Sequence, residues 1–285
     1  MINCIYCNSK KIIKFKEVKD RFSKEIFIYN KCTNCGLVFL DSIPLEKDIL
    51  KYYPDNYEAY QLINDDKVLD KKIKLISRLC AQCSSILDIG CSNGSFLISA
   101  KENNFEHIFG IELNTQIAKI ASDRGVEIIG RTLDDASKTG MTFDVITLWD
   151  VFEHLPDPIN ALKKTFIMLN QDGFLFLSIP NLNSFDRFLF GKNWIGWDAP
   201  RHFYLFDQKL MRILLSDVGF TNIQLFGITG AKGAFNLSID KLLNCEISKT
   251  KTFSLFSLLL WPYRQIGYLF NKCPVITIAA KKRIL

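Results

Sequence analysis

Residues 85–94 read Ser-Ile-Leu-Asp-Ile-Gly-Cys-Ser-Asn-Gly, a short apolar run that ends in a turn containing two glycines. The run from Ser85 to Ile89 has the length and composition of a buried β-strand, and the pattern from Phe96 to Asn103 is helical. Gly90 and Gly94 allow the backbone to turn sharply and to approach a ligand closely. Open α/β sheets bind small molecules at the carboxyl ends of their strands. The stretch therefore predicts an α/β fold with a ligand site at this turn.

The alternation of strand and helix continues along the rest of the chain. Apolar runs typical of strands follow at residues 107–112, 126–129, 143–149, 174–179, 220–226 and 274–280. Helices are expected between them, at residues 115–124, from Pro158 onward and at residues 208–217. Such alternation favours right-handed crossovers between parallel strands. We therefore predict a Rossmann-like, doubly wound α/β sheet of seven strands, mostly parallel.

Composition and charge restrict the class of protein. The chain has 285 residues, 48% of them hydrophobic and 23% charged, which is typical of a folded globular protein. The net charge of +6 is too small to indicate a dedicated nucleic-acid binder. The first residues lack the basic and apolar regions of a signal peptide, so we expect a cytoplasmic location with reduced thiols.

Two cysteine pairs indicate a metal site near the N-terminus. Cys4 and Cys7 form one Cys-x2-Cys pair, and Cys32 and Cys35 form a second. Four thiolates match the tetrahedral coordination of zinc and leave no position open for substrate, so the site is expected to be structural. A redox-active pair is the weaker alternative. The prediction is a small zinc ribbon with Cys4, Cys7, Cys32 and Cys35 as ligands.

Two features near the ribbon have less distinctive interpretations. Eight basic side chains against three acidic ones lie between the cysteine pairs. A basic ribbon can contact phosphates, but a solvated surface is the favoured interpretation. The later pair Cys80-x2-Cys83 has no second pair to complete a tetrahedral site, so we expect it to pack at the end of a helix.

Glu112 ends the second predicted strand, 24 residues after Asp88, where a carboxylate can accept both hydroxyl hydrogens of a ribose. The spacing of Gly90 and Gly94 does not match the Gly-x-Gly-x-x-Gly of a nicotinamide dinucleotide site. Residues 87–94 instead resemble the acidic-x-Gly-x-Gly-x-Gly motif of class I S-adenosylmethionine (SAM)-dependent methyltransferases, with Ser92 at the middle glycine. The resemblance implies that SAM is bound by Asp88, Gly90, Ser92, Gly94, Glu112, Leu113, Leu133, Asp134 and Asp150.

Two of these assignments keep an alternative. Asp88 either contacts the cofactor or holds the loop by backbone hydrogen bonds. Residues 132–135 resemble the loop that contacts adenine in this family, but Asp134 and Asp135 are equally suited to capping a helix. Residues 143–158 resemble the fourth strand of the family and the Glu-His element that follows it.

The expected organisation has three parts. Residues 1–40 form the zinc ribbon, residues 41–82 a helical linker or lid, and residues 83–285 the SAM-dependent methyltransferase domain. Within that domain, substrate-loop insertions are expected at about residues 182–207 and 228–272. No feature of the sequence indicates the oligomeric state.

An aromatic loop at residues 193–207 is expected to build the acceptor pocket. Arg201 is suited to clamping a phosphate or carboxylate. Methyl transfer requires a group that removes a proton from the acceptor, and His202 is the first candidate, followed by His154. Tyr204 is expected to donate a hydrogen bond to a developing oxyanion. The alternative for each histidine is a structural hydrogen bond.

The zinc-binding N-terminus, SAM domain and His-Tyr loop together are similar to bacterial deoxysugar C-methyltransferases and related enzymes of polysaccharide assembly. The resemblance implies a small glycosyl or nucleotide-linked acceptor in surface polysaccharide or sugar-nucleotide biosynthesis. Those enzymes have a His-Glu-His element where this chain has Pro200 to Tyr204, so O- or N-methylation is at least as well supported as C-methylation. The alternatives are an RNA methyltransferase that uses the basic ribbon and a non-catalytic interaction module.

The apolar segment from Lys249 to Asn271 has basic residues at its edges. Its apolar runs are too short for a transmembrane helix, for which about 18 apolar residues are needed. Packing under the sheet is the favoured interpretation. Contact with a membrane surface, or with a lipid-linked acceptor, is the alternative, and the protein would then be peripheral to the membrane.

Overall fold

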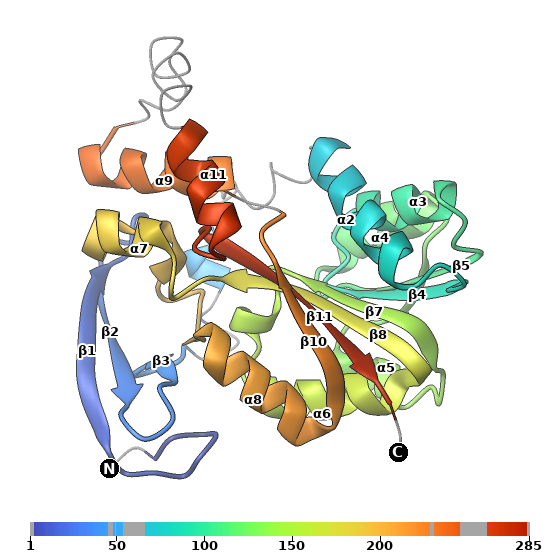
Figure 1. Ribbon diagram of the computed structural model, residues 1–285, viewed down its shortest axis with the longest axis horizontal. Coiled ribbons are helices and arrows are strands. Elements are labelled where there is room, and N and C mark those ends of the chain that lie inside the picture. The colour runs from blue at the N-terminus through green and yellow to red at the C-terminus, as the bar shows by residue number, and fades with distance from the viewer. Residues whose placement is uncertain are drawn as a thin grey trace. The chain divides into compact units, whose positions relative to one another are not determined.

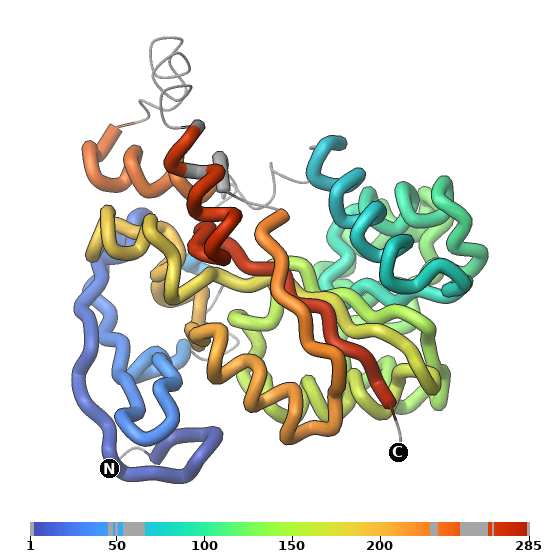
Figure 2. Tube along the Cα trace, in the orientation of Figure 1, coloured from blue at the N-terminus to red at the C-terminus, as the bar shows by residue number. Residues whose placement is uncertain are grey.

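The computed structural model describes residues 3–44, 48, 50–53, 66–228, 231–245 and 261–283 (Figures 1 and 2). The chain divides into two compact units. The first unit comprises Met1–Asp55, Ile179–Met211 and Thr229–Ile276, and the second comprises Asn56–Ser178, Arg212–Ile228 and Thr277–Leu285. We call them the ribbon unit and the sheet unit.

The sheet unit is built on a seven-stranded sheet in the order β10-β11-β8-β7-β4-β5-β6. Its strands are β4 (Ser85–Ile89), β5 (His107–Ile111), β6 (Glu127–Gly130), β7 (Phe143–Trp149), β8 (Leu169–Pro180), β10 (Phe220–Phe226) and β11 (Val275–Lys282). Strands β6, β5, β4, β7 and β8 are parallel, whereas β10 and β11 pair antiparallel. The predicted doubly wound, seven-stranded α/β fold is confirmed.

Helices cover both faces of this sheet, with α2, α3 and α4 on one face and α5, α6 and α8 on the other (Figure 1). Their bounds are α2 (Asp66–Leu79), α3 (Ser95–Glu102), α4 (Thr115–Asp123), α5 (Leu133–Ser137), α6 (Pro158–Met168) and α8 (Gln208–Val218), and a short 3-10 helix, η4 (Phe152–His154), follows β7. Helices α4 and α6 each have a side-chain N-cap at the residue before their first turn. Asn114 accepts from the backbone N–H of Gln116 and Ile117, and Asp157 accepts from that of Asn160.

The core of the sheet unit forms where apolar strand residues meet the helices. Ile86, Val145, Phe176 and Ala279 are fully buried on the neighbouring strands β4, β7, β8 and β11. Fully burying such side chains contributes about 1.5–3 kcal/mol each, with less for alanine. The strands predicted at residues 85–89, 143–149 and 220–226 have these bounds in the structure.

The ribbon unit contains an antiparallel four-stranded sheet in the order β1-β2-β3-β9. Its elements are β1 (Ile12–Lys19), β2 (Ile26–Cys32), β3 (Val38–Leu40), η1 (Leu50–Tyr52), α7 (Phe185–Phe190), η5 (Gly191–Asn193), η6 (Ile195–Trp197), β9 (Tyr204–Leu205), α9 (Ala231–Leu243) and α11 (Trp261–Leu269). Strand β9 pairs with β3 through Val38 with Leu205 and Phe39 with Tyr204. The insertion predicted at residues 182–207 therefore packs with the N-terminal ribbon, because its hydrogen-bond partners lie there, and the insertion predicted at residues 228–272 falls in the same compact unit.

Two predicted segments lie partly outside the described residues. Helix α2 and η1 belong to the expected linker of residues 41–82, but residues 54–65 between them are not described. Residues 249–260 of the apolar C-terminal segment are also outside the description, and α11 follows them. Within the described ranges, every helix is too short or too polar to cross a lipid bilayer.

Candidate functional site

The turn after β4 adopts a conformation that requires small residues. Gly90 has φ +74° and Gly94 φ +77°, both in the left-handed region. A Cβ at Gly90 would lie 2.6 Å from Val151 Cγ2, and a Cβ at Gly94 would lie 2.8 Å from Val126 Cγ2. Ser92 also has a positive φ, +49°, at a cost of about 1–2 kcal/mol for a residue that has a side chain. The roles predicted for the two glycines agree with this geometry.

Glu112 ties this turn to the start of α4. Its Oε2 accepts a hydrogen bond from the backbone N–H of Ser92 at 2.9 Å, and its Oε1 accepts from that of Asn114 at 2.9 Å. A carboxylate has about four acceptor positions, so two further hydrogen bonds are available. Leu113, beside it, is half exposed. The carboxylate fits the predicted role of accepting ribose hydroxyls while it holds the loop.

Asp88 faces the interior of the sheet. It is 3% exposed, and its Oδ1 accepts a hydrogen bond from Thr147 Oγ1 on β7 at 2.5 Å. Burial raises the pKa of this carboxyl to about 7, although the hydrogen bond from Thr147 and the nearby Lys72 ammonium oppose the increase. The observed bond goes to a neighbouring strand rather than to the loop backbone.

Asp150 follows β7 and is held by β8. It has φ +57°, its backbone N–H donates to Ser178 Oγ at 2.9 Å, and Ser178 Oγ donates to Asp150 Oδ1 at 2.9 Å. Strands β7, β4 and β5 are adjacent and parallel, so their carboxyl ends meet at one edge of the sheet. This edge brings together Asp88, Glu112 and Asp150, which come from three separate segments of the chain.

The two adjacent aspartates at the start of α5, Asp134 and Asp135, have different contacts. Asp135 forms a capping box with Thr132, in which its carboxylate accepts from the Thr132 backbone and hydroxyl and Thr132 Oγ1 accepts from the Asp135 N–H. The helix-cap alternative is therefore correct for Asp135. Asp134 is largely exposed and forms an ion pair with Lys164. Leu133 is the first residue of α5, and contact of Leu133 and Asp134 with adenine stays a prediction.

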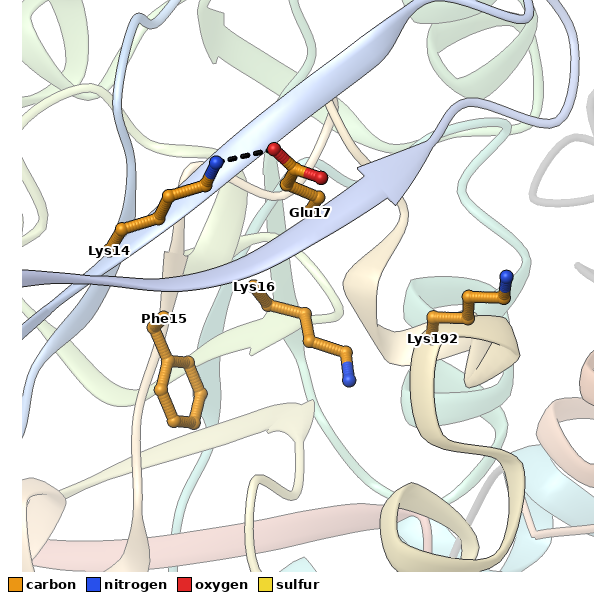
Figure 3. A pocket seen from close by; sticks show the side chains of 5 residues that line it. All are labelled: Lys14, Phe15, Lys16, Glu17 and Lys192. Atoms are coloured by element: carbon orange, nitrogen blue, oxygen red, sulfur yellow. Dashed lines mark hydrogen bonds and ion pairs between the residues drawn. The ribbon is translucent and has the colours of Figure 1, made fainter.

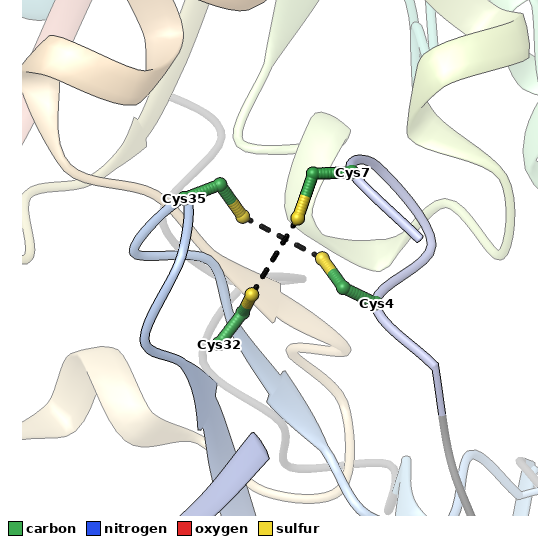
Figure 4. Close-up of side chains that lie close together, drawn as sticks. All are labelled: Cys4, Cys7, Cys32 and Cys35. Atoms are coloured by element: carbon green, nitrogen blue, oxygen red, sulfur yellow. Dashed lines mark hydrogen bonds between the residues drawn. The ribbon is translucent and has the colours of Figure 1, made fainter. Parts of the chain in front are cut away.

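The four N-terminal cysteines converge on one point (Figure 4). Cys4 Sγ lies 3.5 Å from Cys35 Sγ, and Cys7 Sγ lies 3.6 Å from Cys32 Sγ. All four sulfurs lie within 4.8 Å of one another. A tetrahedral site with Zn–S bonds of about 2.3 Å places its sulfurs about 3.8 Å apart. The donor set and its spacing therefore fit zinc.

Cys80 and Cys83 are joined by a disulfide at the end of α2. Both side chains also pack against the core of the sheet unit. The prediction of packing at a helix end was incomplete, because it did not foresee the bond between the two sulfurs. Spacing alone does not distinguish these outcomes, since a Cys-x2-Cys pair suits a metal, a disulfide or simple packing.

The predicted catalytic groups lie on η4, on β9 and in the loop before β9. His202 Nδ1 forms a hydrogen bond with the Gly196 carbonyl at 2.8 Å, which matches the structural alternative for that nitrogen. Tyr204 lies on β9, is 3% exposed and packs near Phe206. His202 and Tyr204 belong to the ribbon unit, and His154 lies on η4 of the sheet unit. Their catalytic roles stay predictions.

Arg201 does not have the exposed position expected of an anion clamp. It is fully buried, and its guanidinium donates to both carboxylate oxygens of Asp198, at 2.8 and 2.7 Å. It also donates to Asp20 at 2.6 Å and to the Tyr52 carbonyl at 2.7 Å. The guanidinium holds the pKa of Asp198 well below its usual range. Arg201 therefore stabilises the ribbon unit, and the prediction that it binds substrate anions was wrong.

A shallow surface cleft of the ribbon unit is lined by Lys14, Phe15, Lys16, Glu17 and Lys192 (Figure 3). Lys14 and Glu17 form an ion pair, and both are more than half exposed. The ammonium of Lys31 lies 5.2 Å from the Phe15 ring centroid. Exposed pairs of this kind contribute little energy, which agrees with the favoured interpretation of a solvated surface.

Comparison with known proteins identifies the family. A family model described as a methyltransferase domain matches residues 60–225, which is more than half of the chain. The chain belongs to this methyltransferase-domain family. It is 31% identical over 105 residues to a ubiquinone biosynthesis O-methyltransferase of Aeromonas salmonicida (strain A449), covering 34% of this chain and 44% of the relative.

A second relative with the same description, from Actinobacillus pleuropneumoniae serotype 7 (strain AP76), is 27% identical over 137 residues, covering 43% of this chain and 58% of the relative. The methyltransferase chain thus spans about half the length of the curated relatives it matches. These relatives share a core with it, while its ribbon residues before position 60 lie outside the family model.

Solved structures share the fold. Phosphoethanolamine N-methyltransferase 2 of Haemonchus contortus, in complex with SAM, is 14% identical with a TM-score of 0.57, covering 95% of this chain and 71% of that chain. A SAM-dependent methyltransferase of Thermotoga maritima, described as a possible histamine N-methyltransferase, is 17% identical with a TM-score of 0.54, covering 82% and 99%. These similarities show the Rossmann-like methyltransferase fold.

Proposed function

We propose that this protein is a SAM-dependent methyltransferase whose cofactor site lies at the carboxyl ends of β4, β5 and β7. The observation that carries the proposal is the left-handed turn at Gly90 and Gly94, which Glu112 ties to the next strand in a chain of the methyltransferase-domain family. A backbone without side chains at these positions can approach a ligand closely. The neighbouring acidic residues suit a ligand with hydroxyl and ammonium donors.

Each residue of the site has a defined part in this proposal. Gly90, Ser92 and Gly94 form the turn that borders the cofactor, and Glu112 accepts the ribose hydroxyl hydrogens. Leu133 and Asp134 are proposed to contact adenine, and the position of their loop after β6, the strand beside β5, supports this assignment. SAM supplies an electrophilic methyl group when it is bound. The protein has to align an acceptor atom with that methyl group and remove a proton from it.

We further propose a small glycosyl or nucleotide-linked acceptor, in surface polysaccharide or sugar-nucleotide biosynthesis. The support is the resemblance of the ribbon and the aromatic loop to deoxysugar methyltransferases, together with the position of the ribbon outside the residues that the family model matches. A fold of this kind serves many substrates, so the acceptor is determined by such additional parts. The proposal includes a cytoplasmic location with access to sugar nucleotides, peripheral to the membrane where the acceptor is lipid-linked.

The four cysteines are proposed to hold one structural zinc ion. Four thiolates leave no coordination position for a substrate, so the ion would order the ribbon without taking part in the reaction. Four deprotonated sulfurs around Zn²⁺ carry a net charge of −2, which the basic side chains of the ribbon offset.

His202 is proposed as the residue that removes the proton, with His154 as the second candidate and Tyr204 as an assisting donor. The carbonyl oxygen of Gly196 can only accept, so its hydrogen bond with His202 Nδ1 places the proton of the neutral imidazole on Nδ1. Substituting His202→Ala is expected to lower kcat by about 100-fold or more with SAM affinity nearly unchanged. His107→Ala, at the opposite end of β5 from the site, is the matched control. Equal turnover of the His202 variant and the control would exclude His202 as the base.

The direct test of the function is transfer of a labelled methyl group from SAM to defined acceptors. Nucleotide sugars, the corresponding keto-sugars, undecaprenyl-linked sugars and total RNA are supplied separately, and the product is identified by mass spectrometry. Methylation of a sugar nucleotide supports the proposed acceptor class. Methylation of RNA alone would replace it with the nucleic-acid alternative, in which the basic ribbon binds the phosphate backbone. No transfer by protein that binds SAM would favour a non-catalytic module.

A further inference from the structure

Lys72 on α2 is a buried lysine in the sheet unit. The residue is 9% exposed and shares the buried face of the helix with Ile73, Leu75 and Ile76. Its ammonium lies 4.4 Å from the ring centroid of Trp149, the last residue of β7. Sequence reasoning did not single out this lysine, because α2 contains several other lysines.

The ammonium of Lys72 has no anionic partner of its own among the described residues, where neither an ion pair nor a hydrogen bond to Nζ is found. Burial lowers the pKa of Lys72, and the nearby Asp150 and Asp88 carboxylates oppose that decrease. Lysines are almost never fully buried unless they are paired. The cation–π contact with Trp149 compensates only part of the desolvation cost.

A second polar donor lies at the same place. The indole Nε1 of Trp149 is buried, and no hydrogen-bond acceptor for it exists among the residues that the structure describes. Two buried donors side by side, one of them charged, are satisfied together by a ligand that brings an anionic acceptor.

The order of the strands indicates which end of the cofactor reaches these donors. Strands β7, β4, β5 and β6 are neighbours in this order, and all four are parallel. In the proposed function, adenine lies at the loop after β6 and the ribose at Glu112 after β5. The remaining part of SAM, its methionine moiety, then extends over β4 toward β7, where Trp149 and Lys72 lie. The methionine moiety contains the only carboxylate of SAM.

We infer that Lys72 binds the carboxylate of the methionine moiety of SAM, with the ring of Trp149 positioning the ammonium. This inference rests on the proposed function. Asp88 and Asp150, the two carboxylates nearest to Lys72 in electrostatic effect, are suited to the α-ammonium group of the same moiety. Lys72 therefore contributes to cofactor specificity. It favours ligands that contain the methionine moiety over adenosine ligands that lack it.

The test compares two ligands by isothermal titration calorimetry. S-adenosylhomocysteine carries the carboxylate, whereas 5′-methylthioadenosine has the same adenosine and thioether without the amino-acid end. Lys72→Met removes the charge and keeps a flexible apolar side chain on Trp149. We expect this variant to bind S-adenosylhomocysteine about 10- to 100-fold more weakly and to bind methylthioadenosine within about twofold of the unsubstituted protein. Lys71→Met, on the exposed side of α2, is the control and should change neither affinity.

Two results would overturn the inference. Equal weakening of both ligands by Lys72→Met would assign Lys72 a structural role, and an unchanged affinity for S-adenosylhomocysteine would exclude any role in binding. If the variant does not fold, the unsubstituted protein is titrated with S-adenosylhomocysteine and its decarboxylated analogue. A loss of at least about tenfold for the analogue supports the inference, and equal affinities contradict it. Failure of the unsubstituted protein to bind either SAM or S-adenosylhomocysteine would instead contradict the proposed function.

Discussion

Glu112 and Asp88 are carboxyl groups at the ends of adjacent strands, and their surroundings give them different tasks. Glu112 accepts two backbone hydrogen bonds at the edge of the site, while Asp88 lies in the interior beside Thr147. Glu112→Ala is expected to weaken SAM binding by about 1–3 kcal/mol, because hydrogen bonds to a charged acceptor are lost and the turn at Ser92 is released. Calorimetry that shows an unchanged affinity would contradict the ribose assignment.

Asp88 makes stability depend on pH. Its pKa is raised to about 7 in the folded protein, against about 3.9 in the unfolded chain. Between these values the unfolded chain releases the proton and the folded protein keeps it, so the free energy of unfolding falls as the pH rises from about 4 to 7. Asp88→Asn removes this titration and keeps an acceptor for Thr147. The variant should gain stability over the unsubstituted protein on going from pH 5 to pH 8, measured by urea unfolding. If the free energy of unfolding differs between the two proteins by the same amount at pH 5 and at pH 8, the raised pKa of Asp88 is contradicted.

At the scale of elements, Arg201 joins three segments of the ribbon unit through Asp20, Asp198 and the Tyr52 carbonyl. Arg201→Met is expected to destabilise this unit by about 3–5 kcal/mol, because the buried carboxylates of Asp20 and Asp198 lose the charge and the hydrogen bonds of the guanidinium. Urea unfolding is followed by fluorescence in a Trp149→Phe background, which removes the signal of the sheet unit and leaves that of Trp194 and Trp197, both buried in the ribbon unit. The exposed Lys192→Met is the control, with an effect within about 0.5 kcal/mol. Similar unfolding curves for the two variants would show that the network does not stabilise the unit.

The zinc ion proposed for Cys4, Cys7, Cys32 and Cys35 can be tested in the same unit. One zinc ion per chain is expected in purified protein, and Cys32→Ser should lose it and destabilise β2 and β3, because the ion links the N-terminal turn to the turn between these strands. Cys245→Ser, at an exposed free cysteine, is the control and should keep full zinc content. Metal analysis that finds no zinc in the folded, unsubstituted protein would exclude the site.

For the whole molecule, local sequence patterns predicted the sheet and the glycine turn, but they did not predict contacts between residues far apart in the sequence. The strands at residues 85–89 and 143–149 are apolar runs with defined ends, so their bounds follow from composition. The pairing of β9 with β3 joins residues far apart in the sequence, and no local sequence pattern indicates this pairing. Arg201 was predicted to bind substrate anions because its partner Asp20 lies 181 residues away in the sequence, where no local pattern indicates the contact. The convergence of the four cysteines was predictable, because the Cys-x2-Cys spacing is itself the sequence pattern of a metal site.

Binding of SAM to the folded protein tests the account most directly. Unsubstituted protein with its metal content verified is titrated with SAM by calorimetry. A 1:1 complex with a dissociation constant on the order of 1–100 µM is the expected result for a working cofactor site. No binding up to about 1 mM SAM, a limit that corresponds to roughly −4 kcal/mol, would contradict the cofactor site and with it the proposed function.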